Sequence, residues 1–152
     1  MLAALVLSAV LTTTSLHPHL PFDFYICTLC SIMKDQDETT RREVTETEYE
    51  LLARVCMSEA GTEPLEGKIA VLETVLNRVD RGEGSISEVI NAPRQYSTRD
   101  NGDPNEECYE AVDAVLEFSD RYPENMLYFR TKHYHKFGTP YKKIGNHYFT
   151  LG

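Results

Sequence analysis

Glu59 has the sequence setting of a general acid. It follows Leu52, Val55 and Cys56 at spacings of seven, four and three residues, so it continues their apolar stripe in a predicted helix that ends at Gly61. A carboxyl group that leans inward at a helix end is partly desolvated, which raises its pKa as acid catalysis near neutral pH requires. The position equally suits a glutamate that only pairs with a nearby Arg or amide.

Glu73 is a second inward-facing carboxylate. It lies four residues after Ile69 and three before Leu76, in the next predicted helix. Two carboxylates on the inner faces of consecutive helices could share a cleft. Glu73 could equally belong to a structural network with Arg54 and Arg78.

Three predicted helices and a β element would position these groups. A Thr-x-x-Glu capping pattern starts the first helix at 45–47, a proline opens the second over 64–78, and the third spans 106–118. A loop rich in Gly, Pro, Asn and Asp covers 91–105. From 126 onward, apolar and aromatic residues alternate with polar ones between glycine turns, which predicts a small antiparallel β element.

The C-terminal β element combines tyrosines with positive charge. Residues 125–152 carry a net charge of +5, against −14 for residues 1–124. Aromatic rings stack on sugar faces and cations attract carboxylates, so this segment suits an anionic glycan. An ordinary tyrosine-containing sheet with a solvated basic face is the alternative interpretation.

Histidines and cysteines give little support for a metal site. His133 and His135 are two residues apart on a predicted strand, so they would lie on one face as a metal pair does. Only His147 offers a further ligand nearby, and Cys56 and Cys108 are single residues within predicted helices. We expect no metal and no cofactor.

The N-terminal part of the chain differs from the rest. Residues 1–33 are mostly apolar and are interpreted as an export signal or anchor, although no basic residue precedes the apolar run. Within them, Cys27 and Cys30 are interpreted as packed or membrane-associated thiols. The alternatives are a disulfide or redox pair, or a zinc-stabilised interaction domain built on these two cysteines with His133 and His135. Residues 34–46 are a charged linker and 47–152 the catalytic domain. This organisation predicts a secreted or envelope-associated protein.

Composition limits the class of protein. The chain has 152 residues, 41% hydrophobic and 26% charged, which is typical of one globular domain with an appendage. A net charge of −9 argues against nucleic acid as the main partner. No apolar run reaches the length of a membrane-spanning helix, and we expect a monomer.

Four segments, in this order, are more specific than any single motif: ELLARVCMSEAGTEPLEGKIAVLETVLNRV (50–79), RQYS (94–97), LYFR (127–130) and IGNHYF (144–149). Together they resemble the bacterial cell-wall hydrolase family of spore-cortex-lytic enzymes, the SleB/CwlJ type, over about 48–150. The resemblance implies an α+β fold, a lysozyme-like or lytic-transglycosylase-like helical domain with a small C-terminal antiparallel β element. Tyr96 stands where the family usually has Phe, and Gly61-Thr62 replaces the more familiar Arg-Gly.

The resemblance also implies a substrate and an acid. The substrate would be peptidoglycan glycan strands, cleaved at the β-1,4 bond between N-acetylmuramic acid and N-acetylglucosamine, with Glu59 as the catalytic acid. A lytic transglycosylase, which forms 1,6-anhydromuramyl ends, is the preferred reaction. The first alternative is a hydrolytic muramidase, which would need a second carboxylate, with Glu73 as the first candidate and Glu63 or Glu66 after it. The second alternative is a protein without enzymatic activity, an inactive peptidoglycan-binding module.

Further residues are expected to bind the glycan. The candidates lie beside the second predicted helix, in the 91–105 loop and in the β element: Glu63, Gln95, Tyr96, Ser97, Tyr128, Tyr134 and Tyr148.

Overall fold

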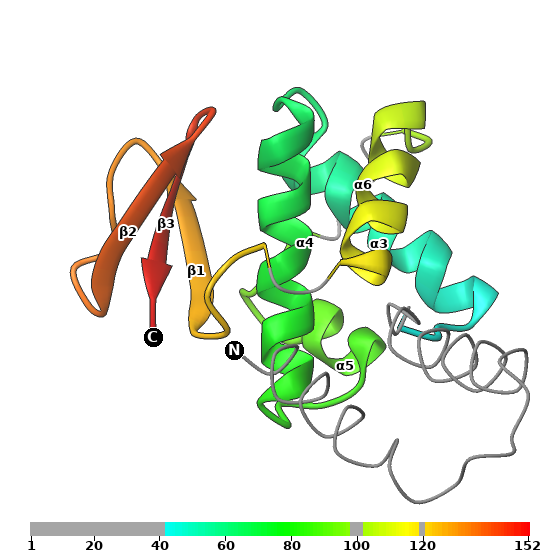
Figure 1. The fold of residues 1–152 in the computed structure, drawn as a ribbon, viewed down its shortest axis with the longest axis horizontal. Coiled ribbons are helices and arrows are strands. Elements are labelled where there is room, and N and C mark those ends of the chain that lie inside the picture. The colour runs from blue at the N-terminus through cyan, green and yellow to red at the C-terminus, as the bar shows by residue number, and fades with distance from the viewer. Residues whose placement is uncertain (1–41, 98–101, 119–120) are drawn as a thin grey trace, which may run out of the picture. The chain divides into compact units, whose positions relative to one another are not determined.

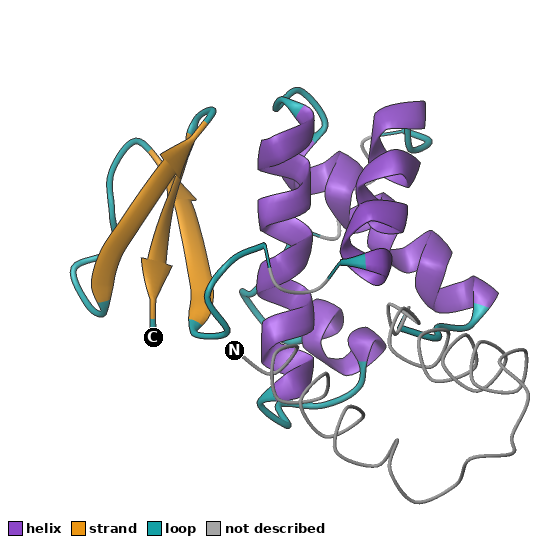
Figure 2. Cartoon of the chain, viewed as in Figure 1, coloured by secondary structure: helices purple, strands orange, loops and turns teal. Residues whose placement is uncertain are grey.

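The computed structural model describes residues 42–97, 102–118 and 121–152, so the predicted segment 1–33 and most of the predicted linker 34–46 lie outside the described residues. The described residues form four helices followed by a three-stranded antiparallel sheet (Figures 1 and 2), which confirms the predicted α+β class. With the labels of Figure 1, the elements are α3 (Glu46–Ala60), α4 (Leu65–Asp80), α5 (Ile86–Asn91), α6 (Glu106–Glu117), β1 (Met126–Thr131), β2 (Thr139–Ile144) and β3 (His147–Leu151).

Local capping patterns start the helices. The Thr45 hydroxyl accepts from the Glu48 amide at 3.3 Å, and the Glu48 carboxylate accepts from the Thr45 amide at 2.9 Å, as the sequence predicts. The same reciprocal pair joins Ser85 and Glu88 at the start of α5, a helix that the sequence analysis missed. The Ser-x-x-Glu pattern was the available signal. Asn105 caps α6 with its side chain.

Helix α4 lies between the sheet and the other helices (Figure 1). One side packs Leu72 and Leu76 against α3, α5 and α6, and another packs Ala70 and Val71 against the sheet. Pro64 is the residue before the helix rather than its first residue, and the helix continues to Asp80, beyond the predicted end. Because both sides are covered, residues 67–78 are all buried.

The sheet has the order β1-β3-β2, with β3 in the centre. Phe149 on β3 pairs with Phe129 on β1 and is fully buried against the helices. Since successive side chains of a strand alternate between faces, Tyr148 points to the outer face. The edge strand β2 contains Pro140 and a bulge next to it, a position where proline is tolerated.

His133 and His135 do not lie on a strand, so the prediction that they share a strand face was wrong. Strand β1 ends at Thr131, and Lys132 turns the chain with a φ of 75°. His135 instead lies with its Nε2 atom 3.2 Å from the Phe129 carbonyl oxygen. Within the described ranges, no group of three His, Cys, Asp or Glu side chains is arranged to hold a metal ion.

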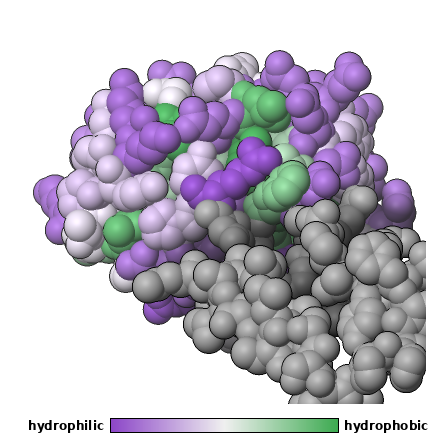
Figure 3. All heavy atoms as spheres, in the orientation of Figure 1, coloured by the Kyte–Doolittle hydropathy of each residue, from purple (hydrophilic) through white to green (hydrophobic). Residues whose placement is uncertain are grey.

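The face of the molecule in Figure 3 is mostly hydrophilic, with apolar residues as separate spots. Among the described residues, the exposed large hydrophobic side chains are Phe118, Phe137 and Tyr141. No described helix is both long and apolar enough to cross a membrane. The apolar side chains of the described residues therefore lie mainly in the two clusters on either side of α4.

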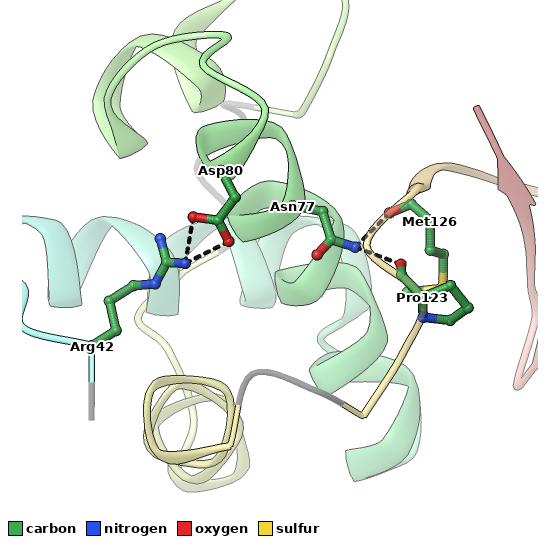
Figure 4. Close-up of polar contacts among 5 residues, drawn as sticks. All are labelled: Arg42, Asn77, Asp80, Pro123 and Met126. Carbon is green, nitrogen blue, oxygen red and sulfur yellow. Dashed lines mark hydrogen bonds and ion pairs between the residues drawn. The ribbon is translucent and has the colours of Figure 1, made fainter. Parts of the chain in front are cut away.

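Two polar contacts of very different exposure hold the end of α4 (Figure 4). The Asn77 amide donates to the carbonyl oxygens of Pro123 and Met126, both at 3.0 Å, and so fixes the segment that leads into β1. On another side of the helix, Arg42 contacts both oxygens of Asp80 at 2.6 Å in an exposed ion pair. Arg42, from the predicted linker, thus packs on the helical domain.

Glu63 attaches the β2–β3 turn to the helices. Its carboxylate accepts from the Asn146 backbone amide at 2.8 Å and from the Asn146 side-chain amide at 2.9 Å. Burial alone would raise the pKa of Glu63, but the Asn146 hydrogen bonds and the nearby His147 and Lys68 hold it below the ordinary value. Gly145 lets the turn approach this closely, since a Cβ atom there would lie 1.9 Å from a Glu63 oxygen.

We predict that Asn77→Ala lowers the free energy of unfolding by about 2–4 kcal/mol, because it leaves two carbonyl groups without their donor. Asp80→Ala, at the exposed ion pair, should lower it by at most about 1 kcal/mol. Urea denaturation of both variants measures the difference. Equal losses would contradict the role given to Asn77.

Gly145→Ala and Gly82→Ala form a second matched pair, because both glycines have positive φ, 55° and 79°. Each substitution should cost roughly 1–2 kcal/mol of backbone strain. No heavy atom lies within 4 Å of a Cβ at position 82, whereas position 145 meets the Glu63 carboxylate. We therefore expect Gly145→Ala to lower the thermal unfolding midpoint clearly more than Gly82→Ala, and a similar shift in both would argue against the Glu63 contact.

Candidate active site

Glu59 is the penultimate residue of α3, where that helix reaches the sheet. The stripe that precedes it, Leu52, Val55 and Cys56, is buried as the sequence predicts, and Glu59 itself is partly buried. The next residue, Ala60, belongs to the cluster that joins α4 to the sheet. The helix thus brings a carboxyl group to the junction of the helices and the sheet.

The surroundings of Glu59 favour its protonated form. Burial raises its pKa, and a hydrogen bond from the Ser97 backbone amide to Glu59 Oε1 only partly opposes this. The carbonyl end of a helix disfavours negative charge, and α3 has no basic residue in its last turn to offset it. Glu59 can therefore carry a proton at a higher pH than an ordinary glutamate.

The segment that supplies the Ser97 amide is anchored by Tyr96. The Tyr96 hydroxyl lies 3.0 Å from Thr74 Oγ1, which itself lies 2.7 Å from the Val71 carbonyl oxygen and donates to it. Because Thr74 has one hydroxyl proton, Tyr96 is the donor to Thr74. Tyr96 is only 9% exposed, so it anchors the loop rather than forming an exposed groove wall, the role that the sequence suggested. Because Tyr96 directly precedes Ser97, anchoring its ring also holds the amide that contacts Glu59.

Arg78 connects the same loop to the sheet, and the sequence analysis missed it as a site residue. Its Nη1 atom donates to Gln95 Oε1, and its Nε atom lies 3.3 Å from the Glu83 carboxylate. The guanidinium also lies 5.5 Å from the centre of the Tyr128 ring. A basic residue next to buried positions of the second predicted helix was the sequence signal, and the sequence indicated it as a partner for Glu73.

Glu73 leaves α4 in a different direction from Thr74, the α4 residue that contacts Tyr96 in the loop beside Glu59. Glu73 is 1% exposed. The pKa of the nearby Tyr122 is raised to about 12, mainly by burial and also by the negative charges of Glu66 and Glu73. Thr74, the next residue, is the one that contacts Tyr96. Successive helical residues point about 100° apart, so Glu73 leaves α4 in a different direction from Thr74.

Three other predicted glycan-binding residues have contacts with parts of the domain other than the loop beside Glu59. Both carboxylate oxygens of Glu63 accept from Asn146. The rings of Tyr134 and Tyr148 contact each other edge to face at 5.1 Å. Tyr148 is on the outer face of the sheet, whereas Phe149, on the inner face, packs in the cluster of α3 and α4. Of the predicted residues, the structure thus groups Gln95, Tyr96, Ser97 and Tyr128 around Glu59 and Arg78.

Comparisons with known proteins concern the fold and the family. Two solved structures match the fold. One is the catalytic domain of the germination-specific lytic transglycosylase SleB from Bacillus anthracis, with 25% identity and a TM-score of 0.61 over 70% of this chain and 96% of that chain. The other is the catalytic domain of the Bacillus cereus SleB protein, with 27% identity and a TM-score of 0.60 over 74% of this chain and 96% of that chain.

Sequence comparisons give the family. No curated protein sequence matches this chain. The sequence model of the family described as Cell Wall Hydrolase matches residues 62–150, which begin three residues after Glu59 and make up more than half of the chain. The chain therefore belongs to the cell wall hydrolase family of enzymes.

Proposed function

We propose that this enzyme is a lytic transglycosylase that degrades peptidoglycan, cleaving between N-acetylmuramic acid and N-acetylglucosamine with Glu59 as acid and base. The observation that carries the proposal is a partly buried carboxyl group with a raised pKa, oriented by the Ser97 amide, in a domain similar to SleB. A wall substrate further implies that the enzyme works outside the cytoplasmic membrane, secreted or attached to the envelope, and we propose that it does so as a monomer.

The reaction needs one carboxyl group. Because Glu59 Oε1 accepts from the Ser97 amide, Oε2 is the oxygen that carries the proton. Glu59 donates it to the bridging oxygen while the muramyl C1 develops oxocarbenium character. The C6 hydroxyl then attacks C1 and gives its proton to the Glu59 carboxylate, which closes the 1,6-anhydro ring and restores the acid. The position of Glu73 on another side of α4 supports this route over hydrolysis with two carboxylates.

The central test is digestion of purified spore and vegetative peptidoglycan by the full chain, by Glu59→Gln and by Glu73→Gln, with fragments identified by mass spectrometry. We expect fragments one water lighter than hydrolysis products. Loss of the acid should reduce the rate by roughly 10²–10⁴-fold in Glu59→Gln. Glu73→Gln should give the same anhydro products, provided that circular dichroism shows that it folds.

Other outcomes would each reject part of the proposal. Fragments with ordinary reducing ends that require Glu73 would establish a hydrolytic muramidase. Equal rates for the wild type and Glu59→Gln would reject Glu59 as the acid. Tight binding of uncut glycan by the wild type would indicate a binding module.

The opposite pKa shifts of Glu59 and Glu63 predict opposite effects on stability. A carboxyl group whose pKa is raised on folding destabilises the protein once the pH exceeds its unfolded pKa, so Glu59→Gln should stabilise the protein at pH 7. This gain should disappear as the pH falls below about 4.5, the ordinary pKa of glutamate.

Glu63→Gln is the matched control, because the pKa of Glu63 is lowered on folding. The stabilisation by Glu63 is present above its unfolded pKa and is lost as the pH falls through its folded pKa. Glu63→Gln should therefore destabilise the protein at pH 7 and have progressively less effect in acid. Urea denaturation from pH 3 to pH 7 measures both variants, and changes of the same sign at pH 7 would contradict the environments described here.

A further inference from the structure

The two faces of the sheet differ in how their charges are paired. Lys142 of β2 lies opposite Phe149, on the face that packs against the helices, and its Nζ atom lies 2.8 Å from the Glu66 carboxylate. Lys143, the next residue, lies opposite Tyr148 on the outer face. No carboxylate of the described residues lies within ion-pair distance of the Lys143 ammonium group. The outer face therefore carries positive charge that the described part of the chain does not neutralise.

A row of paired residues crosses the outer face. Tyr148 on the central strand β3 lies between Arg130 on β1 and Lys143 on β2. The Lys143 Nζ atom lies 5.3 Å from the centre of the Tyr148 ring, which the Tyr134 ring contacts edge to face at 5.1 Å. Because neighbouring strands are about 4.8 Å apart, the backbones that carry the two cations are about 10 Å apart. We call these four residues the outer-face cluster, two cations on either side of two aromatic rings.

The segment around this cluster adds positive charge and no negative charge. Residues 125–152 contain no Asp or Glu. Lys132 and Lys136 are exposed in the connection from β1 to β2. Neither they nor Arg130 lie within ion-pair distance of a carboxylate in the described ranges. Since like charges repel one another, an anion bound among these cations would be stabilised by several of them at once.

The aromatic rings narrow the class of anion. Tyr134 and Tyr148 are both partly exposed, and a tyrosine ring offers an apolar face on which a sugar ring can stack. Peptidoglycan carries both of the groups that this surface suits, because its sugar rings bear peptides with free carboxylates. The net charge of −9 for the whole chain makes nucleic acid a poor alternative.

We propose that the outer-face cluster is a second binding site for peptidoglycan, in which the tyrosine rings contact sugars and Arg130 and Lys143 pair with peptide carboxylates. The cluster lies on the face of the sheet that is turned away from the helices (Figure 1). A strand bound there is held without being cut, while another strand occupies the site of Glu59. The inference rests on the proposed function, because both sites take the same polymer. Two sites on one chain raise the local concentration of substrate even where the outer site is weak.

The test measures binding rather than cleavage. The full chain with Glu59→Gln, which leaves the polymer uncut, is sedimented with purified peptidoglycan that has been freed of phosphate-containing polymers. Adding Arg130→Gln together with Lys143→Gln should raise the dissociation constant roughly 3–30-fold, the loss expected for two exposed ion pairs. Amidation of the peptide carboxylates should weaken binding of the Glu59→Gln protein by a similar factor. It should change little for the protein that also lacks the two cations.

Arg54→Gln together with Arg81→Gln is the matched control in the same background, because both arginines are exposed and lie outside the sheet. The control should bind as tightly as the protein with Glu59→Gln alone. Arg130→Lys together with Lys143→Arg keeps both charges and should also retain binding. Equal weakening by the control pair would overturn the proposal, because it would indicate attraction by the total charge of the chain.

Two other results would also overturn the proposal. One is an unchanged dissociation constant after Arg130→Gln with Lys143→Gln, and the other is binding that requires the phosphate-containing polymers. Failure of this site is distinguishable from failure of the proposed reaction. Charge-dependent binding by a wild type that releases no fragments would support the outer site and reject the reaction. Release of anhydro fragments without such binding would reject the outer site alone.

Discussion

Helix α4 is buried along its middle, so each polar side chain that it carries there must find a partner inside the protein. The partners belong to different parts of the chain. Lys68 reaches Glu107 on α6 at 2.8 Å, while Thr74, Asn77 and Arg78 contact the loop beside Glu59 and the segment before β1. These hydrogen bonds and the ion pair therefore fix the helices, the segment before β1 and the loop that contains Gln95 and Tyr96 relative to one another.

Two glutamates four residues apart show how the environment assigns a role to one residue type. Glu59 has one amide donor and lies at the carbonyl end of a helix, so its neutral form is favoured. Glu63 has two donors from Asn146 and nearby positive charge, so its ionised form is favoured. The first arrangement suits proton transfer and the second suits a permanent structural contact.

The sequence predicted those structural features that depend only on residues a few positions apart, such as the start of a helix and the side of the helix on which a residue lies. Helical spacing placed Glu59 on the inner side of α3, and the Thr45–Glu48 pattern located its start, because both are properties of one turn of helix. Contacts between distant segments leave no such pattern, so the contact of Glu63 with Asn146 was not foreseen.

Two further features have equally local explanations. The spacing of Glu73 from Ile69 and Leu76 predicted that it faces inward, but left open whether that side of the helix meets the loop beside Glu59. A fully covered helix, however, buries every side, and the spacing cannot show which side meets the site. The end of β1 was also unpredictable, since it depends on Lys132 adopting positive φ, which the residue type disfavours.

The edge of the sheet influences how copies of this enzyme behave when they crowd on one substrate. Residues 139–143 of β2 are exposed, and an open strand edge normally invites pairing with a second chain. Pro140 offers no N–H group for such pairing, the adjacent bulge disturbs the spacing of the remaining groups, and Lys142 and Lys143 repel a like-charged edge. These features disfavour edge-to-edge pairing between two copies of the chain, including copies that a shared polymeric substrate would bring close together.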